Sequence, residues 1–198
     1  SKECRYHTPG AASPTQKYSD AEAHKWKIDN EKSTASVTVY KCDETGCTET
    51  KSIILSTSDN VTVSDTVLNG TSEITLPEAT INFDASAKGA LSGKGQISVS
   101  ASTLDETERE TAILSANLTN EQKASIRGKK IYSFTASTDA DADIHKLNGK
   151  AKITLPYTLA PGENPEYIVV WYLSSAGLEA ISADYFKDAY GAGCVSFV

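Results

Sequence analysis

The residue types that carry acid–base and nucleophilic chemistry are present in this chain, but they do not form a catalytic pattern. The three histidines, His7, His24 and His145, are far apart in the sequence. No serine lies in a Gly-x-Ser-x-Gly segment, the turn that exposes the nucleophile of many hydrolases. The carboxylates gather in turns and in residues 105–110, where solvation explains them better than a glycosidase cleft does. The sequence therefore predicts no catalytic residue and no enzyme.

A short acidic segment is the one candidate for binding calcium. Asp139, Asp141 and Asp143 place carboxylates at alternate positions, and calcium prefers oxygen ligands of this kind. An EF-hand loop would also need glycine and glutamate where this chain has Ile144 and Lys150. We therefore expect an acidic turn between strands and no cofactor, with calcium as the alternative.

The cysteines are the candidates for covalent cross-links, and they are Cys4, Cys42, Cys47 and Cys194. Four cysteines allow three pairings. The local pair Cys42–Cys47 is favoured because the residues between them contain a turn, and this pairing leaves Cys4 for Cys194. Both disulfides imply an oxidising, extracellular compartment. The alternative is a zinc site in which Cys42 and Cys47 join His7 and His24.

Aromatic side chains are the candidates for a ligand-binding surface. Trp171 lies in the apolar run Tyr167–Leu173, which predicts a central strand packed on both faces. Tyr185, Phe186 and Tyr190 lie in a less apolar region. We predict these three rings as the ligand face.

Composition limits the class of protein and its partners. The chain has 198 residues, a formal net charge of −7 and a pI of about 5.0. Binding to nucleic acid requires a clustered basic face, so this charge argues against it. No apolar run approaches the roughly 20 residues of a membrane span, so we expect no membrane insertion. The absence of methionine indicates a mature fragment or a trimmed domain.

The pattern of apolar residues predicts strands through most of the chain. Residues 35–41 alternate with a period of two, and with residues 47–55 they predict a hairpin. Further strands are expected at 95–101, 130–136 and 150–155. Thr119 and Gln122 fit the capping-box pattern of a short helix that Gly128 closes. Residues 103–110 are expected to be a solvated loop.

These elements predict an all-β protein. We expect a β-sandwich, either immunoglobulin-like or a distorted barrel, with one short helix and a small N-terminal β-hairpin appendage. Residues 1–55 form the irregular segment and the cysteine-containing hairpin in this prediction. Residues 56–198 form the sandwich domain.

Several segments in the second half carry a resemblance. They are Gly149–Tyr157, Val169–Tyr172, Gly177–Glu179 and Val195–Phe197. From about residue 77 onward the chain resembles the β-rich module near the carboxyl end of large secreted, S-layer-type surface proteins of anaerobic Gram-positive bacteria and methanogens. In that group a Thr-x-His-Phe-Ser-x-Tyr segment usually follows the last strand. The resemblance therefore implies that the last strand is truncated here.

The first part of the chain carries a second, degraded resemblance. His24-Lys-Trp26 and Tyr40-Lys-Cys42, followed by Cys47, resemble the His-x-Trp and Tyr-x-Cys-x-x-x-x-Cys repeats of similar surface proteins. The upstream cysteine often seen there is missing, and that difference leaves the pairing scheme open.

The resemblance implies a non-catalytic structural or adhesive module at the cell surface, acting as a spacer or display domain. Its partners would be neighbouring domains of the same surface protein. One alternative is a module that binds glycan or a host protein. Another is a self-processing domain that is cut near its C-terminus.

Overall fold

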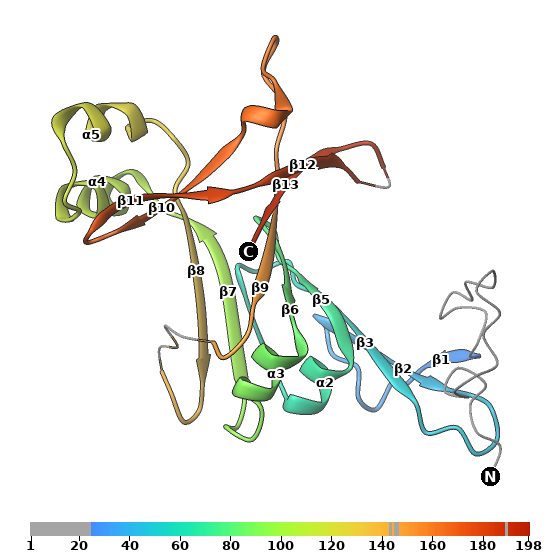
Figure 1. Ribbon diagram of the computed structural model, residues 1–198. Coiled ribbons are helices and arrows are strands. Elements are labelled where there is room, and N and C mark those ends of the chain that lie inside the picture. Colours follow the sequence, from blue (N-terminus) through green and yellow to red (C-terminus); the bar gives the residue numbers. More distant parts are fainter. Residues whose placement is uncertain (1–24, 143, 145–146, 189) are drawn as a thin grey trace.

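Strands dominate the computed structural model, which describes residues 25–142, 144, 147–188 and 190–198 (Figure 1). Its largest part is an eight-stranded sheet in the order β1-β2-β3-β5-β6-β9-β13-β12. These strands are β1 Trp26–Ile28, β2 Val37–Cys42, β3 Thr50–Leu55, β5 Thr71–Thr75, β6 Thr80–Phe83, β9 Ala151–Pro156, β12 Asp184–Lys187 and β13 Gly193–Phe197. Only β3 and β5 pair in parallel, so the sheet is mixed. The sheet is open and does not close into a barrel.

A second, antiparallel sheet of three strands has the order β4-β7-β8. Its strands are β4 Asn60–Val63, β7 Ile97–Thr103 and β8 Tyr132–Thr138. Every second residue of β7 is buried: Ile97, Val99 and Ala101 are at most 1% exposed. These side chains form one core cluster with inward residues of the large sheet such as Ile54 and Ile74. The two sheets therefore share a hydrophobic core.

Two short helices cover the same core at its lower end in Figure 1. Helix α2 (Asp65–Asn69) buries Leu68, and helix α3 (Ala85–Leu91) buries Ala87 and Leu91. Asp84 caps α3, because its carboxylate accepts a hydrogen bond from the Ala87 N–H at 2.7 Å. The same carboxylate accepts the Lys150 N–H at 3.0 Å. Asp84 therefore ties α3 to the start of β9.

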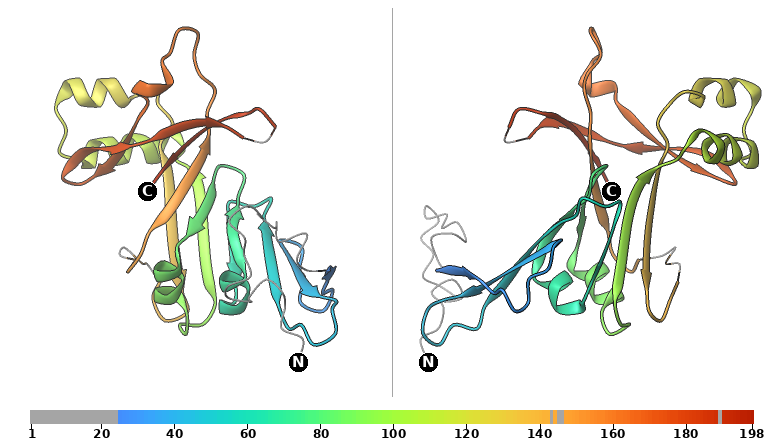
Figure 2. Two further views of the ribbon diagram at one scale, coloured as in Figure 1. Left: turned by 45° about the vertical axis from the view of Figure 1, so that its right-hand side comes forward. Right: turned by 180° about the vertical axis from the view of Figure 1, so that it is seen from behind.

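A group of elements stands away from this core, and we call it the arm (Figures 1 and 2). It consists of α4 Glu106–Ser115, α5 Asn120–Ile126, β10 Val169–Ser174 and β11 Gly177–Ser182. Strands β10 and β11 form a separate two-stranded sheet. The 3-10 turn η2 (Pro165–Tyr167) precedes β10. The Asn117 N–H donates to the carbonyl oxygen of Ser175 at 3.1 Å, which joins the end of α4 to the hairpin turn.

The structure confirms part of the expected pattern and corrects the rest. The hairpin of residues 35–55 forms as β2 and β3, and α5 begins with the capping box of Thr119 and Gln122. The hairpin is not an appendage, because β3 pairs with β5 inside the large sheet. The prediction of one short helix is wrong, since α2, α3 and α4 are helices too.

Two segments were assigned to the wrong structure. The predicted loop at 103–110 contains the first half of α4, which Asp105 and Glu108 start with their own capping box. The run Tyr167–Leu173 is not a central strand. It contains most of β10, which among the described strands pairs only with β11, and Trp171 is 55% exposed.

Candidate functional site

The cysteines do not pair as predicted. Cys42 and Cys194 are free thiols, so neither Cys42–Cys47 nor Cys4–Cys194 forms. Cys42 is buried at the end of β2, opposite Trp26 of β1, whereas Cys47 lies beyond the turn at Gly46. Cys47 is disulfide-bonded. That bond removes its thiolate from the alternative zinc site.

The other free thiol belongs to Cys194 in β13. The pKa of Cys194 is raised by desolvation and by the nearby negative charge of Asp188. A raised pKa makes a cysteine a weak nucleophile at neutral pH. Cys194 is therefore a weak nucleophile at neutral pH.

The predicted aromatic face is divided between two sides of a strand. Tyr185 and Phe186 are consecutive in β12, so their side chains point to opposite faces of the sheet. Tyr185 is half-buried and its ring approaches Gly193, whereas Phe186 is 38% exposed. Tyr190 is 96% exposed in the turn that follows. The three rings do not form one platform.

The predicted calcium segment links the start of β7 to the end of β8 in the second sheet. The Asp139 carboxylate accepts the Gln96 N–H at 2.8 Å, and Thr138 and Asp141 form an isolated β-bridge. Asp143 lies outside the described residues, as do His7, His24 and His145. Within the described ranges, no three His, Cys, Asp or Glu side chains gather closely enough to hold a metal ion.

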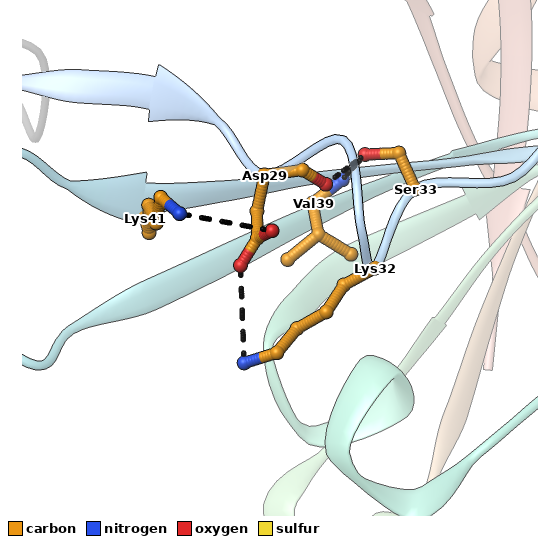
Figure 3. Close-up of polar contacts among 5 residues, drawn as sticks. All are labelled: Asp29, Lys32, Ser33, Val39 and Lys41. Atoms are coloured by element: carbon orange, nitrogen blue, oxygen red, sulfur yellow. Dashed lines mark hydrogen bonds and ion pairs between the residues drawn. The ribbon is translucent and has the colours of Figure 1, made fainter.

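A buried carboxylate that the sequence did not single out lies at the β1–β2 connection (Figure 3). The side chain of Asp29 is only 6% exposed, and two ammonium groups flank it. Lys32 Nζ lies 3.9 Å from Oδ2 and Lys41 Nζ lies 3.8 Å from Oδ1. Both distances exceed that of a hydrogen bond. Asp29 Oδ1 has no hydrogen-bond partner among the described residues.

The backbone around Asp29 is fixed by a tight turn. The Asp29 N–H donates to the carbonyl oxygen of Val39 at 2.8 Å, and the Ser33 hydroxyl donates to the carbonyl oxygen of Asp29 at 2.8 Å. The Ser33 hydroxyl in turn accepts the Val39 N–H at 3.0 Å. These bonds hold Asp29, and with it Lys32, against the end of β2.

A pocket lies beside this turn, between the β1–β2 connection, β3 and α2. Its volume is about 350 Å³. We call it the hydroxyl pocket, and its lining residues are Lys32, Val39, Thr50, Ser52, Ser64, Thr66 and Val67. Lys32 supplies the one charged side chain of this lining, and the hydroxyls come from Thr and Ser on β3 and α2. The pocket therefore offers hydrogen bonds and one positive charge.

Ser52 is the most buried of the polar residues that line the hydroxyl pocket. It is 6% exposed, and it lies opposite Val39 on the inward face of β3. The pairing of β3 with β5 shifts its register between Ser52 and Ile54. Such bulges re-aim side chains and occur next to binding sites. The sequence gives a weak signal for Ser52, because Ile53 and Leu55 make the opposite face of β3 equally apolar.

An exposed apolar surface lies on the arm, and we call it the hairpin face. Residues directly opposite each other in β10 and β11 share a face. One face therefore carries Val169, Trp171, Leu173, Leu178, Ala180 and Ser182, none of which is charged. Val169 is 46% exposed and Trp171 is 55% exposed.

The comparisons with known proteins found no match. No protein-family model matches it, and neither a curated protein nor a solved structure does. The resemblance to surface-protein modules therefore remains a prediction. No helix within the described residues has the length and apolar character needed to cross a membrane.

Proposed function

We propose that this chain is a non-catalytic structural and adhesive module of an extracellular cell-surface protein. The observation that carries the proposal is the hairpin face, where a tryptophan and a valine are about half exposed on a sheet face without charged residues. Contiguous apolar surface of this kind marks interaction sites. Tryptophan is also among the residues that contribute most to binding energy at protein interfaces.

The shared core of the two sheets supports the role of a stiff spacer. We infer that the eight-stranded and three-stranded sheets form a sandwich, since inward residues of both belong to one core cluster. The arm then projects from that rigid body and displays the hairpin face (Figure 2). The bonded state of Cys47 supports an oxidising compartment.

The partner that we propose for the hairpin face is a second copy of this chain. Net charge of −7 makes most surfaces of two copies repel each other. The hairpin face lacks charge, so two copies can meet there without bringing like charges together. An isolated two-stranded hairpin is also marginally stable in water, and a covering partner would stabilise it.

The test uses two residues of equal exposure on opposite faces of β10. Trp171 and Tyr172 are both 55% exposed, but only Trp171 lies on the hairpin face. We expect the chain to self-associate reversibly in sedimentation-velocity runs as its concentration rises. Trp171→Ser should be monomeric, and Tyr172→Ser should associate like the unmodified chain. A chain that stays monomeric at high concentration, or equal behaviour of the two variants, would contradict the proposal.

The extracellular part of the proposal has its own test. Alkylation in denaturant without reductant should label two cysteines, because two of the thiols are free. Mass spectrometry counts the labels. Four labelled cysteines in the protein secreted by its native host would remove the argument for an oxidising compartment.

A further inference from the structure

Ser52 occupies a position that the packing of the sheet would give to an apolar residue. Its inward neighbours are Val39, directly opposite on β2, and Ile54, two residues along β3. The Ser52 hydroxyl makes no hydrogen bond within the described part of the chain, although the residue is 6% exposed. Its oxygen is not among the buried unpartnered side-chain atoms of the described residues, so it is accessible from the pocket that Ser52 lines. A ligand in the pocket would supply the missing partner.

The other hydroxyls of the pocket are available as well. Ser64 precedes α2, but its side chain makes no capping hydrogen bond. Thr50 and Thr66 also line the pocket and complete the set of hydroxyls. A hydroxyl donates one hydrogen bond and accepts others, so this lining matches a ligand that is itself rich in hydroxyls.

The charged and apolar side chains of the pocket limit the chemical class of its ligand further. Lys32 is the one charged residue that lines the pocket. Its Nζ lies 3.9 Å from Oδ2 of Asp29. An ammonium in that position favours a carboxylate on the ligand. Val39 and Val67 give the pocket an apolar wall, against which the C–H face of a sugar ring can pack. A volume of about 350 Å³ is at the small end of ligand sites.

We propose that the hydroxyl pocket binds an acidic monosaccharide of the uronic acid type. The carboxylate of the sugar pairs with Lys32, and its hydroxyls bond to Ser52 and the neighbouring hydroxyls of β3 and α2. This site lies in the core region, whereas the proposed adhesive function depends on the hairpin face. Either proposal can fail without the other.

The first experiment separates the chemical parts of the ligand. NMR titrations of the isotope-labelled chain use glucuronate, glucose and acetate as probes. We expect glucuronate to shift the amides around Ser52 and Lys32 at the lowest concentration, and glucose and acetate to bind more weakly. Acetate binding as tightly as glucuronate would overturn the sugar assignment. So would an absence of shifts around Ser52 with glucuronate.

The second experiment tests the residues with matched variants. Ser52→Ala should weaken glucuronate binding about tenfold, the value of one lost hydrogen bond to a charged or polar group, while leaving the fold as stable or more stable. Lys32→Gln should weaken glucuronate binding but leave glucose binding unchanged. Lys41→Gln is the control, because Lys41 pairs with Asp29 without lining the pocket. Equal losses for Lys32→Gln and Lys41→Gln would overturn the assignment of the carboxylate to Lys32.

Discussion

Strands β7 and β10 both carry large apolar side chains, yet they differ in what covers those side chains. The inward residues of β7 are at most 1% exposed, because β4 and β8 flank the strand and the large sheet packs against it. Strand β10 has β11 as its one paired neighbour, and Val169, Trp171 and Tyr172 remain 46–55% exposed. Apolar composition therefore marks a strand, but the number of its partners decides whether it belongs to the core.

Truncation of a core side chain should have the largest effect on stability. Ile74 is 0% exposed at the centre of the shared core. Ile74→Ala should lower the free energy of unfolding by about 2–5 kcal/mol, because it removes buried apolar area and leaves a cavity. Urea denaturation followed by tryptophan fluorescence or circular dichroism measures the change.

The matched variant for this test is on the arm. Leu114 of α4 is 61% exposed, so Leu114→Ala should change the free energy of unfolding by less than about 0.5 kcal/mol. If Leu114→Ala cost as much as Ile74→Ala, side-chain burial would not explain the difference between these two positions.

A second test concerns Gly149, whose backbone packs closely against the start of α3. Gly149 leaves no room for a Cβ, because the Ala87 nitrogen and the Asp84 carboxylate occupy that position. Gly149→Ala should therefore lower the free energy of unfolding by about 1–3 kcal/mol. Gly89 lies in α3 with nothing within 4 Å of its Cβ position. Gly89→Ala should instead raise stability by about 0.5–1 kcal/mol, since alanine favours the helix. Thermal unfolding of both variants should show shifts of opposite sign.

The helix caps of the arm should have smaller and more local effects. Asp105→Ala and Thr119→Ala each remove a capping box, which costs about 1 kcal/mol of helix stability. Because the arm stands away from the core, we expect Asp105→Ala to speed amide hydrogen exchange in α4 alone and Thr119→Ala to speed it in α5 alone. Protection of β7 should stay unchanged in both variants. Loss of protection in β7 would mean that the arm and the core unfold as one unit.

The sequence predicts local features well wherever the signal is local. Alternation identifies β2, and the spacing of Thr119 and Gln122 identifies the start of α5. The same spacing at Asp105 and Glu108 marks the start of α4. The loop prediction there gave too much weight to the charge of the segment, although charged residues are ordinary on an exposed helix.

Contacts between segments that lie far apart in the chain could not be predicted from the local pattern of residues. The parallel pairing of β3 with β5 joins strands that are separated by β4 and α2, and no local signal specifies it. The exposure of Trp171 depends on the absence of a second neighbour for β10 among the described strands. The hydroxyl pocket forms only when that crossover brings α2 next to β3, so Ser52 and Lys32 could not be recognised as neighbours from their positions in the chain.

The smallest expected effects concern two carboxylates that accept similar hydrogen bonds. Asp84 lies in the core region and bonds to a distant part of the chain, whereas Glu163 lies in the loop between β9 and η2 and bonds only within that loop. Hydrogen bonds from the Ala87 and Lys150 N–H groups lower the pKa of Asp84 below its ordinary value of 3.8. The hydroxyl of Tyr157, at 2.6 Å, and the Ala160 N–H lower the pKa of Glu163. A lowered folded-state pKa means that each carboxylate stabilises its bonded structure above its ordinary pKa. That contribution is lost as the pH falls through the folded-state value.

The two carboxylates should therefore respond to acid in different ways. Asp84 accepts a hydrogen bond from Lys150, which is 66 positions away in the chain. Glu163 bonds within a loop to residues at most six positions away. Asp84→Asn should lower the urea midpoint near pH 6, and its difference from the unmodified chain should shrink as the pH falls below 3.8. Glu163→Gln should leave that midpoint unchanged at every pH and only speed hydrogen exchange at Ala160. A pH-dependent difference in midpoint between Glu163→Gln and the unmodified chain would show that the loop unfolds together with the core, because only then does the titration of Glu163 affect the global transition.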